Sequence, residues 1–296
     1  MSGTERRGPV VESVATLAEL RERIPAAEGV PTGVPGLDEL FFVPEWRDGR
    51  LHRRPLGGIP RHAVLQVTGV ADTGKSLLVE QYAVTRAAAG ETVAFVTMES
   101  PAPFTAMGLR TRATALGLDR AAVERRVVLL DGATHTVLAR DLAALLDTLA
   151  FAIRTHRVCH VVLDSLTGLF EAREMLARDV VRPLFGFLKT WHQTALLVSQ
   201  KRSGHEALTA EAAGGYAVAH ILDGSLVLAK HPVLSPQAAR LHRVPLGETV
   251  RLFRIDGCRL AGHDTRTHHC EIGPDGILRI GPPLTRTVAG GEEEAS

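Results

Sequence analysis

This sequence has few cysteines, no long apolar run and almost no net charge. Its three cysteines, Cys159, Cys258 and Cys270, are too few for a disulfide framework. No apolar run approaches the roughly 20 residues that span a bilayer, and the start, Met1 to Arg7, has no apolar core of a secretory signal. A formal net charge of +1 gives no overall attraction to nucleic acid or to an anionic membrane. Together these absences predict a cytoplasmic protein with no membrane partner.

No internal repeat is visible either, so the 296 residues suit one large α/β domain with appendages. Apolar strands over 92–98, 126–130, 158–163 and 194–199 alternate with helices over 77–89, 102–116, 138–156 and 171–192. This alternation predicts a mainly parallel sheet with helices on both faces. Turn signals after residue 200 favour a small C-terminal antiparallel extension, with strands over 225–229, 250–255, 267–272 and 277–280.

The domain organisation follows from these patterns. Residues 1–30 are expected to form a tail with a short helix over 11–24, because apolar residues recur there at helical spacing. The main α/β domain is expected over 31–283, with a loop over 41–56 because that stretch mixes aromatic, basic and proline residues. The glutamate-rich stretch over 284–296 is expected to be a disordered acidic tail.

One motif carries the clearest chemistry. An apolar strand from Ala63 leads into the pattern G-x-x-x-x-G-K-S, and helix-forming residues follow, which is the context of a P-loop. Gly69 and Gly74 let backbone N–H groups turn toward phosphate oxygens. Lys75 supplies a charge for the β- and γ-phosphates, and the Ser76 hydroxyl is a hard ligand for Mg²⁺. The predicted ATP-binding residues are Gly69, Val70, Ala71, Asp72, Thr73, Gly74, Lys75, Ser76 and Leu77.

Hydrolysis needs more than a P-loop, and three residues at predicted strand ends are candidates. Asp164 follows the apolar run Cys159 to Leu163, the Walker B arrangement, in which the acid reaches the metal through water. The alternative is a helix N-cap. Glu99 closes the strand over 92–98 and is a candidate general base or a capping acid. Gln200 ends the last strand, where an amide either contacts the γ-phosphate or is simply solvated.

Several segments together resemble a KaiC-type member of the RecA-like P-loop ATPases, over about residues 30 to 283. They are Thr32–Leu40, Gly57–Arg61, the P-loop, Phe95–Glu99 and Val161–Thr167. The resemblance implies a RecA-like core, ATP and Mg²⁺ as ligands, and a homo-oligomer, usually a hexameric ring with ATP between subunits. It also implies that Glu99 is the catalytic glutamate, and it leaves autokinase activity open.

Departures from the family pattern affect the expected subunit interface. Where the family has two adjacent glutamates, Glu99 is followed by Ser100, and residues 41–56 lengthen a junction that is usually short. The family's Lys-x-Arg pair, which acts on a neighbour's ATP, aligns with Arg254-Ile255-Asp256. Arg254 keeps the positive charge of an arginine finger, but Asp256 would be repulsive there.

A second resemblance concerns His220. The stretch Gly214 to His220 is similar to a segment of archaeal and eukaryotic strand-exchange recombinases in which a histidine senses nucleotide across the filament interface. The alternative is a core histidine. The preceding loop, 201–213, has cations but also acids and no aromatic residue, so its support for DNA binding is weak.

Three functions follow from these observations. The first is a ring-forming, Mg-dependent ATPase of the KaiC type that regulates an unidentified protein partner through a nucleotide-driven conformational change. The second is a DNA-binding accessory ATPase of recombination or repair, similar to RecA and RadA. The third is a scaffold in which ATP binding controls assembly and turnover is vestigial.

Overall fold

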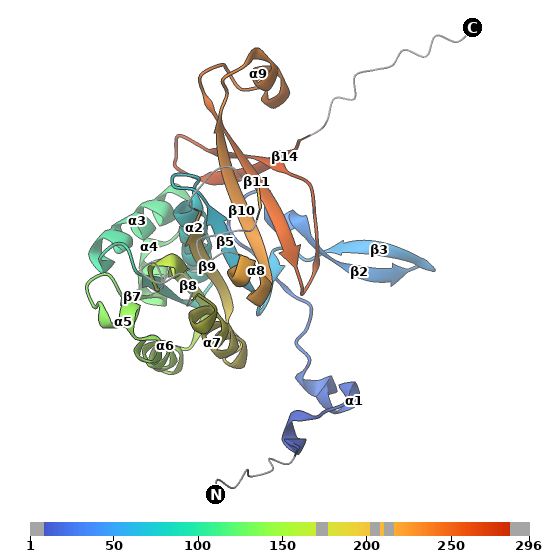
Figure 1. Ribbon diagram of the computed structural model, residues 1–296, viewed down its shortest axis with the longest axis vertical. Helices are drawn as coiled ribbons and strands as arrows, with labels where there is room; N and C mark the ends of the chain where they lie inside the picture. The colour runs from blue at the N-terminus through green and yellow to red at the C-terminus, as the bar shows by residue number, and fades with distance from the viewer. Residues whose placement is uncertain (1–8, 170–176, 202–207, 210–215, 285–296) are drawn as a thin grey trace, which may run out of the picture.

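The computed structural model describes residues 9–169, 177–201, 208–209 and 216–284, and its main feature is one nine-stranded sheet. The strand order is β14-β13-β11-β10-β5-β9-β8-β6-β7 (Figure 1). From β10 to β7 all neighbours are parallel, whereas β10–β11, β11–β13 and β13–β14 are antiparallel. The strands are β5 (Val64–Gly69), β6 (Thr92–Thr97), β7 (Val127–Asp131), β8 (Val158–Asp164), β9 (Thr194–Gln200), β10 (Gly224–Pro232), β11 (Thr249–Cys258), β13 (His268–Ile272) and β14 (Leu278–Pro283).

The sheet carries a hydrophobic core on each face, as its apolar strands require. Alternate residues of β6 divide between the cores: Val93 and Phe95 join one, and Ala94 and Val96 join the other. The first core includes side chains of α2 (Lys75–Ala88), α3 (Ala102–Ala115) and α4 (Arg120–Arg126). The second includes side chains of α5 (Val137–Arg140), α6 (Leu142–His156), α7 (Ala177–Thr190) and α8 (Tyr216–Ile221). The prediction of an α/β fold with a mainly parallel sheet is therefore confirmed.

The predicted helix over 138–156 is interrupted. Asp141 leaves helical geometry and caps α6, since its carboxylate accepts hydrogen bonds from the N–H groups of Ala143 and Ala144. Helices α4, α8 and α9 (Pro236–His242) were not predicted, because each is only six or seven residues long. The extension after residue 200 is antiparallel only in part, since β10 pairs in parallel with β5.

Residues 41–56 form a β-hairpin, so the expectation of a loop is wrong. Strands β2 (Phe41–Arg47) and β3 (Arg50–Pro55) pair antiparallel, and β12 (Gly262–His263) adds a short third strand beside Phe41 and Phe42. Pro44 fits because β12 pairs only with the first two residues of β2, which leaves the outer edge at Pro44 without a ladder partner among the described residues. The hairpin extends away from the main sheet (Figure 1).

The N-terminal segment also differs from the prediction. In place of one helix over 11–24, the chain forms a 3₁₀ turn (Val11–Ser13), the one-turn helix α1 (Leu17–Leu20) and a second 3₁₀ turn (Arg21–Arg23). None of their residues is buried, and α1 lies away from the sheet (Figure 1). The short strands β1 (Gly29–Val30) and β4 (Ile59–Pro60) then pair antiparallel where the chain joins the core.

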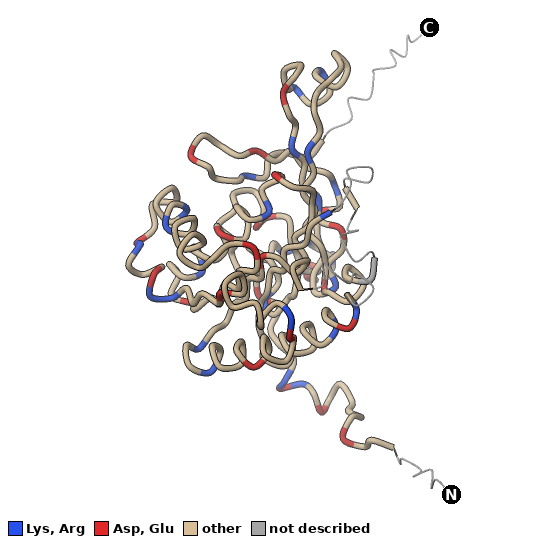
Figure 2. The backbone as a smooth tube through the Cα atoms, turned by 60° about the vertical axis from the view of Figure 1, so that its left-hand side comes forward, with Lys and Arg blue, Asp and Glu red and all other residues tan. Residues whose placement is uncertain are grey.

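The distribution of charged residues and the length of the apolar helices agree with what the composition indicates. Basic and acidic positions are interspersed along the described backbone (Figure 2). Among the described residues, no helix combines the length and apolarity needed to cross a bilayer. The predicted acidic tail, 284–296, lies outside the described residues apart from its first position.

Candidate functional site

Four adjacent strands bring the predicted residues to one edge of the sheet. In the order β5-β9-β8-β6, Gly69 ends β5 opposite Gln200 of β9, and Asp164 ends β8 opposite Thr97 of β6. Glu99 follows two residues after Thr97. Because parallel strands share a direction, these carboxyl ends lie together, and such an edge is where α/β sheets bind ligands.

The P-loop joins β5 to α2 through two positions that require glycine. A Cβ on Gly69 would collide with the carbonyl oxygen of Leu228 on β10. Gly74 has a φ of 100° at the N-cap of α2, and a Cβ there would lie 2.5 Å from the Leu278 side chain. Between them, the carbonyl of Val70 accepts hydrogen bonds from Thr73 Oγ1 at 3.0 Å and from Lys75 Nζ at 2.7 Å. The loop is thus held in a curled form at the N-terminus of a helix, which suits a phosphate.

Lys75 lies in the first turn of α2 and is 7% exposed. Burial lowers the pKa of its ammonium group, and the carboxylates of Asp164 and Glu99 partly offset that effect. A buried cation that faces two carboxylates at a helix N-terminus favours a polyanion such as a triphosphate.

Ser76 and Asp164 form the candidate magnesium site. The Ser76 hydroxyl lies beside the Asp164 carboxylate, which brings two hard oxygen ligands together next to the P-loop. Burial raises the pKa of Asp164, and the Ser76 hydroxyl and the Lys75 charge oppose that rise. Because a carboxylate in this position is stabilised by a cation, the residues fit Mg²⁺.

Glu99 lies at the centre of a polar cluster. Its Oε1 accepts hydrogen bonds from Ser165 Oγ at 2.6 Å and from Gln200 Nε2 at 2.9 Å. The backbone N–H of Gln200 donates to Thr167 Oγ1 at 3.0 Å. Glu99 remains exposed, and its Oε2 has no hydrogen-bond partner among the described residues. The cluster orients one carboxylate oxygen and leaves the other for a solvent molecule.

Arg254 and His220 lie apart from this cluster in their own chain. The Arg254 guanidinium lies 3.8 Å from Asp256 Oδ1 on the same strand, β11. The exposed His220 belongs to α8, just before β10 begins opposite Leu65 at the other end of β5 from the P-loop (Figure 1). Gly214 and Gly215, which carry the recombinase resemblance, lie outside the described residues, as does most of the loop over 201–213. Any role of either side chain at an ATP site would be in a second copy.

Sequence reasoning missed several contacts of the P-loop. Asp72 has a positive φ of 60°, and its carboxylate Oδ2 lies 2.9 Å from Lys230 Nζ of β10 and 3.8 Å from Arg251 of β11. The side chain of Ile272 in β13 joins Leu278 of β14 beside Gly74. All of these partners are more than 150 residues from the P-loop in the sequence, so no local pattern predicts the contacts. Ser165 and Thr167, by contrast, directly follow Asp164 and were identifiable as strand-end polar residues.

Comparison with known proteins agrees with this geometry. A family model for the KaiC ATPase matches residues 30–284. The chain is 30% identical to a UPF0273 protein of Aeropyrum pernix, covering 85% of this chain and 96% of that protein. It is 26% identical to a UPF0273 protein of Thermotoga maritima, covering 84% and 94%. In fold it is similar to the crystal structure of a KaiC-like protein from Pyrococcus horikoshii, with a TM-score of 0.65, 22% identity and coverage of 87% and 100%.

Proposed function

The chain belongs to the KaiC family of ATPases, and we propose that it hydrolyses ATP in a magnesium-dependent reaction at the edge formed by β5, β9, β8 and β6. The observation that carries this proposal is the cluster around Glu99. A P-loop alone is consistent with binding, whereas a carboxylate held by Ser165 and Gln200 beside Lys75 and Asp164 supports turnover.

Glu99 is the general base in this proposal. Its Oε2 accepts the proton of a water molecule while the water oxygen forms a bond to the γ-phosphorus and the bond to the ADP oxygen breaks. Ser165 and Gln200 keep Oε1 in place, so the carboxylate does not have to be oriented during the reaction. Gln200 also senses loss of the γ-phosphate, because the chain at this point is hydrogen-bonded to two parts of the site. The Gln200 N–H donates to Thr167, and the N–H of Lys201 donates to the Gly69 carbonyl at the start of the P-loop.

The P-loop stabilises the charge that develops on the phosphates. Lys75 exchanges its hydrogen bond to the Val70 carbonyl for phosphate oxygens, and the N–H groups at the start of α2 add partial positive charge. Ser76 and Asp164 would hold Mg²⁺, with Asp164 acting through water. The ion would neutralise charge on the β- and γ-phosphates.

We further propose that the protein works as a homo-oligomer with ATP near a subunit interface, in which nucleotide state regulates a protein partner. Arg254 supports this because its guanidinium is half-exposed on a strand outside its own site. In the oligomer, contact with a neighbour's ATP would compete with Asp256.

Phosphate release from ATP by the purified protein tests hydrolysis. We expect turnover that requires Mg²⁺ and falls at least 100-fold in Glu99→Gln, the range for a general base, while ATP binding persists. Lys75→Ala should abolish binding. Asp147→Asn is the matched control, because it also converts an exposed carboxylate to an amide, on α6 and away from the site.

Two outcomes would reject the mechanism. Wild-type turnover in Glu99→Gln would exclude Glu99 as the base. If ATP binds and changes assembly but no phosphate is released, the protein is a nucleotide-controlled scaffold instead. Single-stranded DNA binding that tightens with ATP and weakens with salt would favour the recombination-accessory function.

A further inference from the structure

The β2–β3 hairpin has two chemically different faces. Paired residues of an antiparallel hairpin share a face, and successive pairs alternate. One face carries Phe42–Pro55, Pro44–Arg53 and Trp46–Leu51, and the other carries Val43–Arg54, Glu45–His52 and Arg47–Arg50. The contacts agree with this division: Arg53 lies 4.5 Å over the Phe42 ring, and Arg54 lies 3.7 Å from Glu45. The hairpin is therefore amphipathic, with an apolar face and a charged face.

The apolar face is partly covered at its base, where Phe42 lies against Arg53 and Gly262, but it is exposed at the tip of the hairpin. Trp46 is 74% exposed and Leu51 is 61% exposed. Both lie near the tip, where Trp46 pairs with Leu51. Seven residues of extended strand place the tip roughly 20 Å from the base. A tryptophan and a leucine carried that far into solvent indicate a docking arm.

A second apolar patch lies on α3. Phe104 and Met107 are both 63% exposed, and their spacing of three residues puts them on one side of the helix. Met107 also lines a groove of about 580 Å³ beside Pro103, Ala106 and Arg110. The groove thus combines apolar walls with the polar and basic side chains of Arg110, Thr111, Thr114 and Arg120, and Phe104 lies beside it on the same helix.

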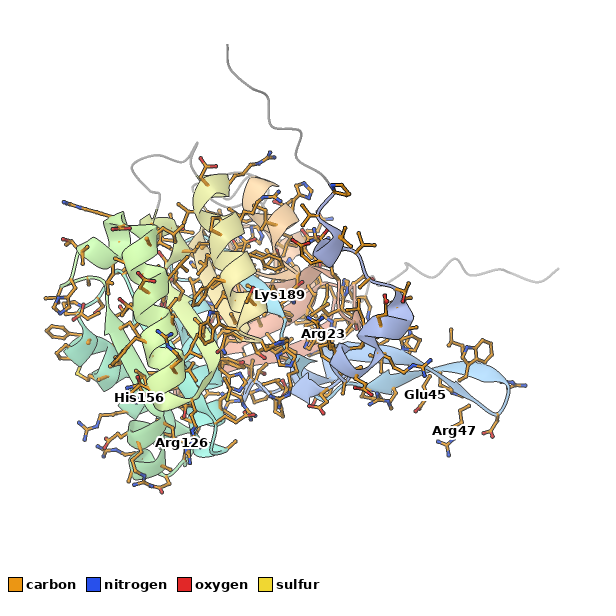
Figure 3. All side chains as sticks on the ribbon, turned by 90° about the horizontal axis from the view of Figure 1, so that it is seen from below. Arg23, Glu45, Arg47, Arg126, His156 and Lys189 are labelled. Carbon is orange, nitrogen blue, oxygen red and sulfur yellow. The ribbon has the colours of Figure 1, made fainter. Side chains whose placement is uncertain are left out.

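These two patches lie on opposite sides of the molecule. Figure 1 shows β2–β3 on one side of the sheet and α3 and α4 on the other. In the view from below, Glu45 and Arg47 of the hairpin again lie far from Arg126, the last residue of α4 (Figure 3). The hairpin therefore cannot cover α3 of its own chain, whereas a head-to-tail contact between copies would cover both patches at once.

We propose that the hairpin of one copy docks its Trp46–Leu51 face on the Phe104–Met107 surface of α3 in the next copy. This inference rests on the proposed homo-oligomer and assigns its contact surface. A second copy is favoured over nucleic acid because three of the hairpin's four arginines, Arg47, Arg50 and Arg54, lie on the face opposite Trp46. The fourth, Arg53, shares the face of Trp46 but lies over the Phe42 ring. Base stacking with phosphate contact needs aromatic and basic groups on one surface.

The exposed apolar area at the tip of the hairpin agrees with the centre of a larger contact. Trp46 and Leu51 together expose roughly 250 Å² of surface, because one tryptophan side chain by itself offers about 150–250 Å² for burial. A stable contact buries about 800 Å² on each partner. The hairpin thus supplies the central apolar contact, and neighbouring surfaces supply the rest.

Docking on α3 would also reach the catalytic cluster. Helix α3 begins three residues after Glu99. Thr105 in its first turn lies 3.3 Å from Thr97 Oγ1, which donates to the carbonyl of Ser100 at 2.6 Å. A contact at Phe104 or Met107 therefore lies next to the turn that positions Glu99, which gives subunit contact a means to alter turnover.

Molar mass measured by light scattering, with and without ATP, tests the contact. We expect the wild type to assemble, and Trp46→Ala/Leu51→Ala and Met107→Asp to dissociate, each weakening association at least about 30-fold. An equimolar mixture of the two should form dimers, because one intact hairpin meets one intact α3 surface. Leu234→Ala/Leu241→Ala is the control, since it truncates equally exposed leucines at α9.

Tryptophan fluorescence gives an independent measurement. The chain has two tryptophans, so Trp191→Phe leaves Trp46 as the sole reporter. Its emission should shift to the blue with protein concentration, and Met107→Asp should prevent the shift. The proposal is overturned if mass and emission are the same in all variants, or if emission responds only to single-stranded DNA or to anionic vesicles. ATP binding by each variant and hydrolysis by the wild type, measured in parallel, separate this outcome from failure of the proposed function. A dissociated variant still binds ATP, whereas failure of the proposed function would show as no phosphate release by the wild type.

Discussion

Acidification should weaken the strand that carries Asp164, because His160 lies buried on the same strand. His160 is fully buried, with Nδ1 2.8 Å from Tyr82 Oη and Nε2 2.9 Å from Glu91 Oε2. A carboxylate can only accept, so Nε2 carries the proton and the Tyr82 hydroxyl donates to Nδ1. If Nδ1 were protonated, the Tyr82 hydroxyl would have to rotate and accept, and its own proton would lose this acceptor in the core. The neutral imidazole is therefore the folded form.

The size of the effect follows from the pKa. Burial lowers the pKa of His160 to about 4 from its ordinary value of 6.5, although Glu91 opposes this. The unfolded chain then takes up this proton first as pH falls, so the stabilisation is present above about pH 6.5 and is lost toward pH 4. At about 1.4 kcal/mol per pH unit, the total is about 3 kcal/mol, of which about 2 kcal/mol is lost by pH 5.

Urea unfolding of the wild type and of His160→Gln at pH 7.5 and 5.0 checks this prediction. Glutamine does not titrate, so the wild type should lose about 2 kcal/mol more than the variant between the two pH values. His62→Gln is the control, because burial also lowers the pKa of His62 but this side chain is only half-buried. Equal losses in the wild type and His160→Gln would refute the assignment of a neutral, buried His160.

Three further changes test single contacts. Gly74→Ala should abolish ATP binding by calorimetry, since its Cβ meets Leu278, whereas Gly90→Ala, with the same positive φ but open space, should cost only about 1 kcal/mol of stability. Asp223→Ala should cost about 2 kcal/mol in urea unfolding, because the buried Val64 N–H at the base of β5 loses its acceptor and Lys189 Nζ keeps only the His62 carbonyl. Lys230→Ala should change the free energy of unfolding by less than about 0.5 kcal/mol but weaken ATP binding severalfold, since Asp72 in the P-loop loses its ion pair with Lys230.

Much of the site was predictable because its signals are local. A strand, a glycine-rich turn and a helix follow one another from Val64 to Ala88, and phosphate binding depends on their order alone. Asp164 and Glu99 were identifiable because each ends an apolar strand, and parallel strands end at one edge. The contact that orients Glu99 was not predictable, because Ser165 and Gln200 reach it from two other strands.

The hairpin shows why local rules failed elsewhere. Two prolines and four arginines made residues 41–56 resemble a loop, yet residues 42–47 pair with residues 50–55 and Phe41 packs in the core. The prediction for the N-terminal segment was wrong in the opposite direction. Its apolar residues do recur at helical spacing, but no residue of α1 is buried, and isolated short helices are marginal in water.

By itself the sequence determined the fold class, the phosphate loop and the two carboxylates, since hydrophobic period and motif order are properties of neighbouring residues. Only the tertiary structure decided which side chains meet. The contacts of Lys230 with Asp72 and of His160 with Tyr82 and Glu91 join residues that are distant in the chain, and β2 lies on the other side of the sheet from α3. Their placement depends on the order and register of the strands, which local pattern does not encode.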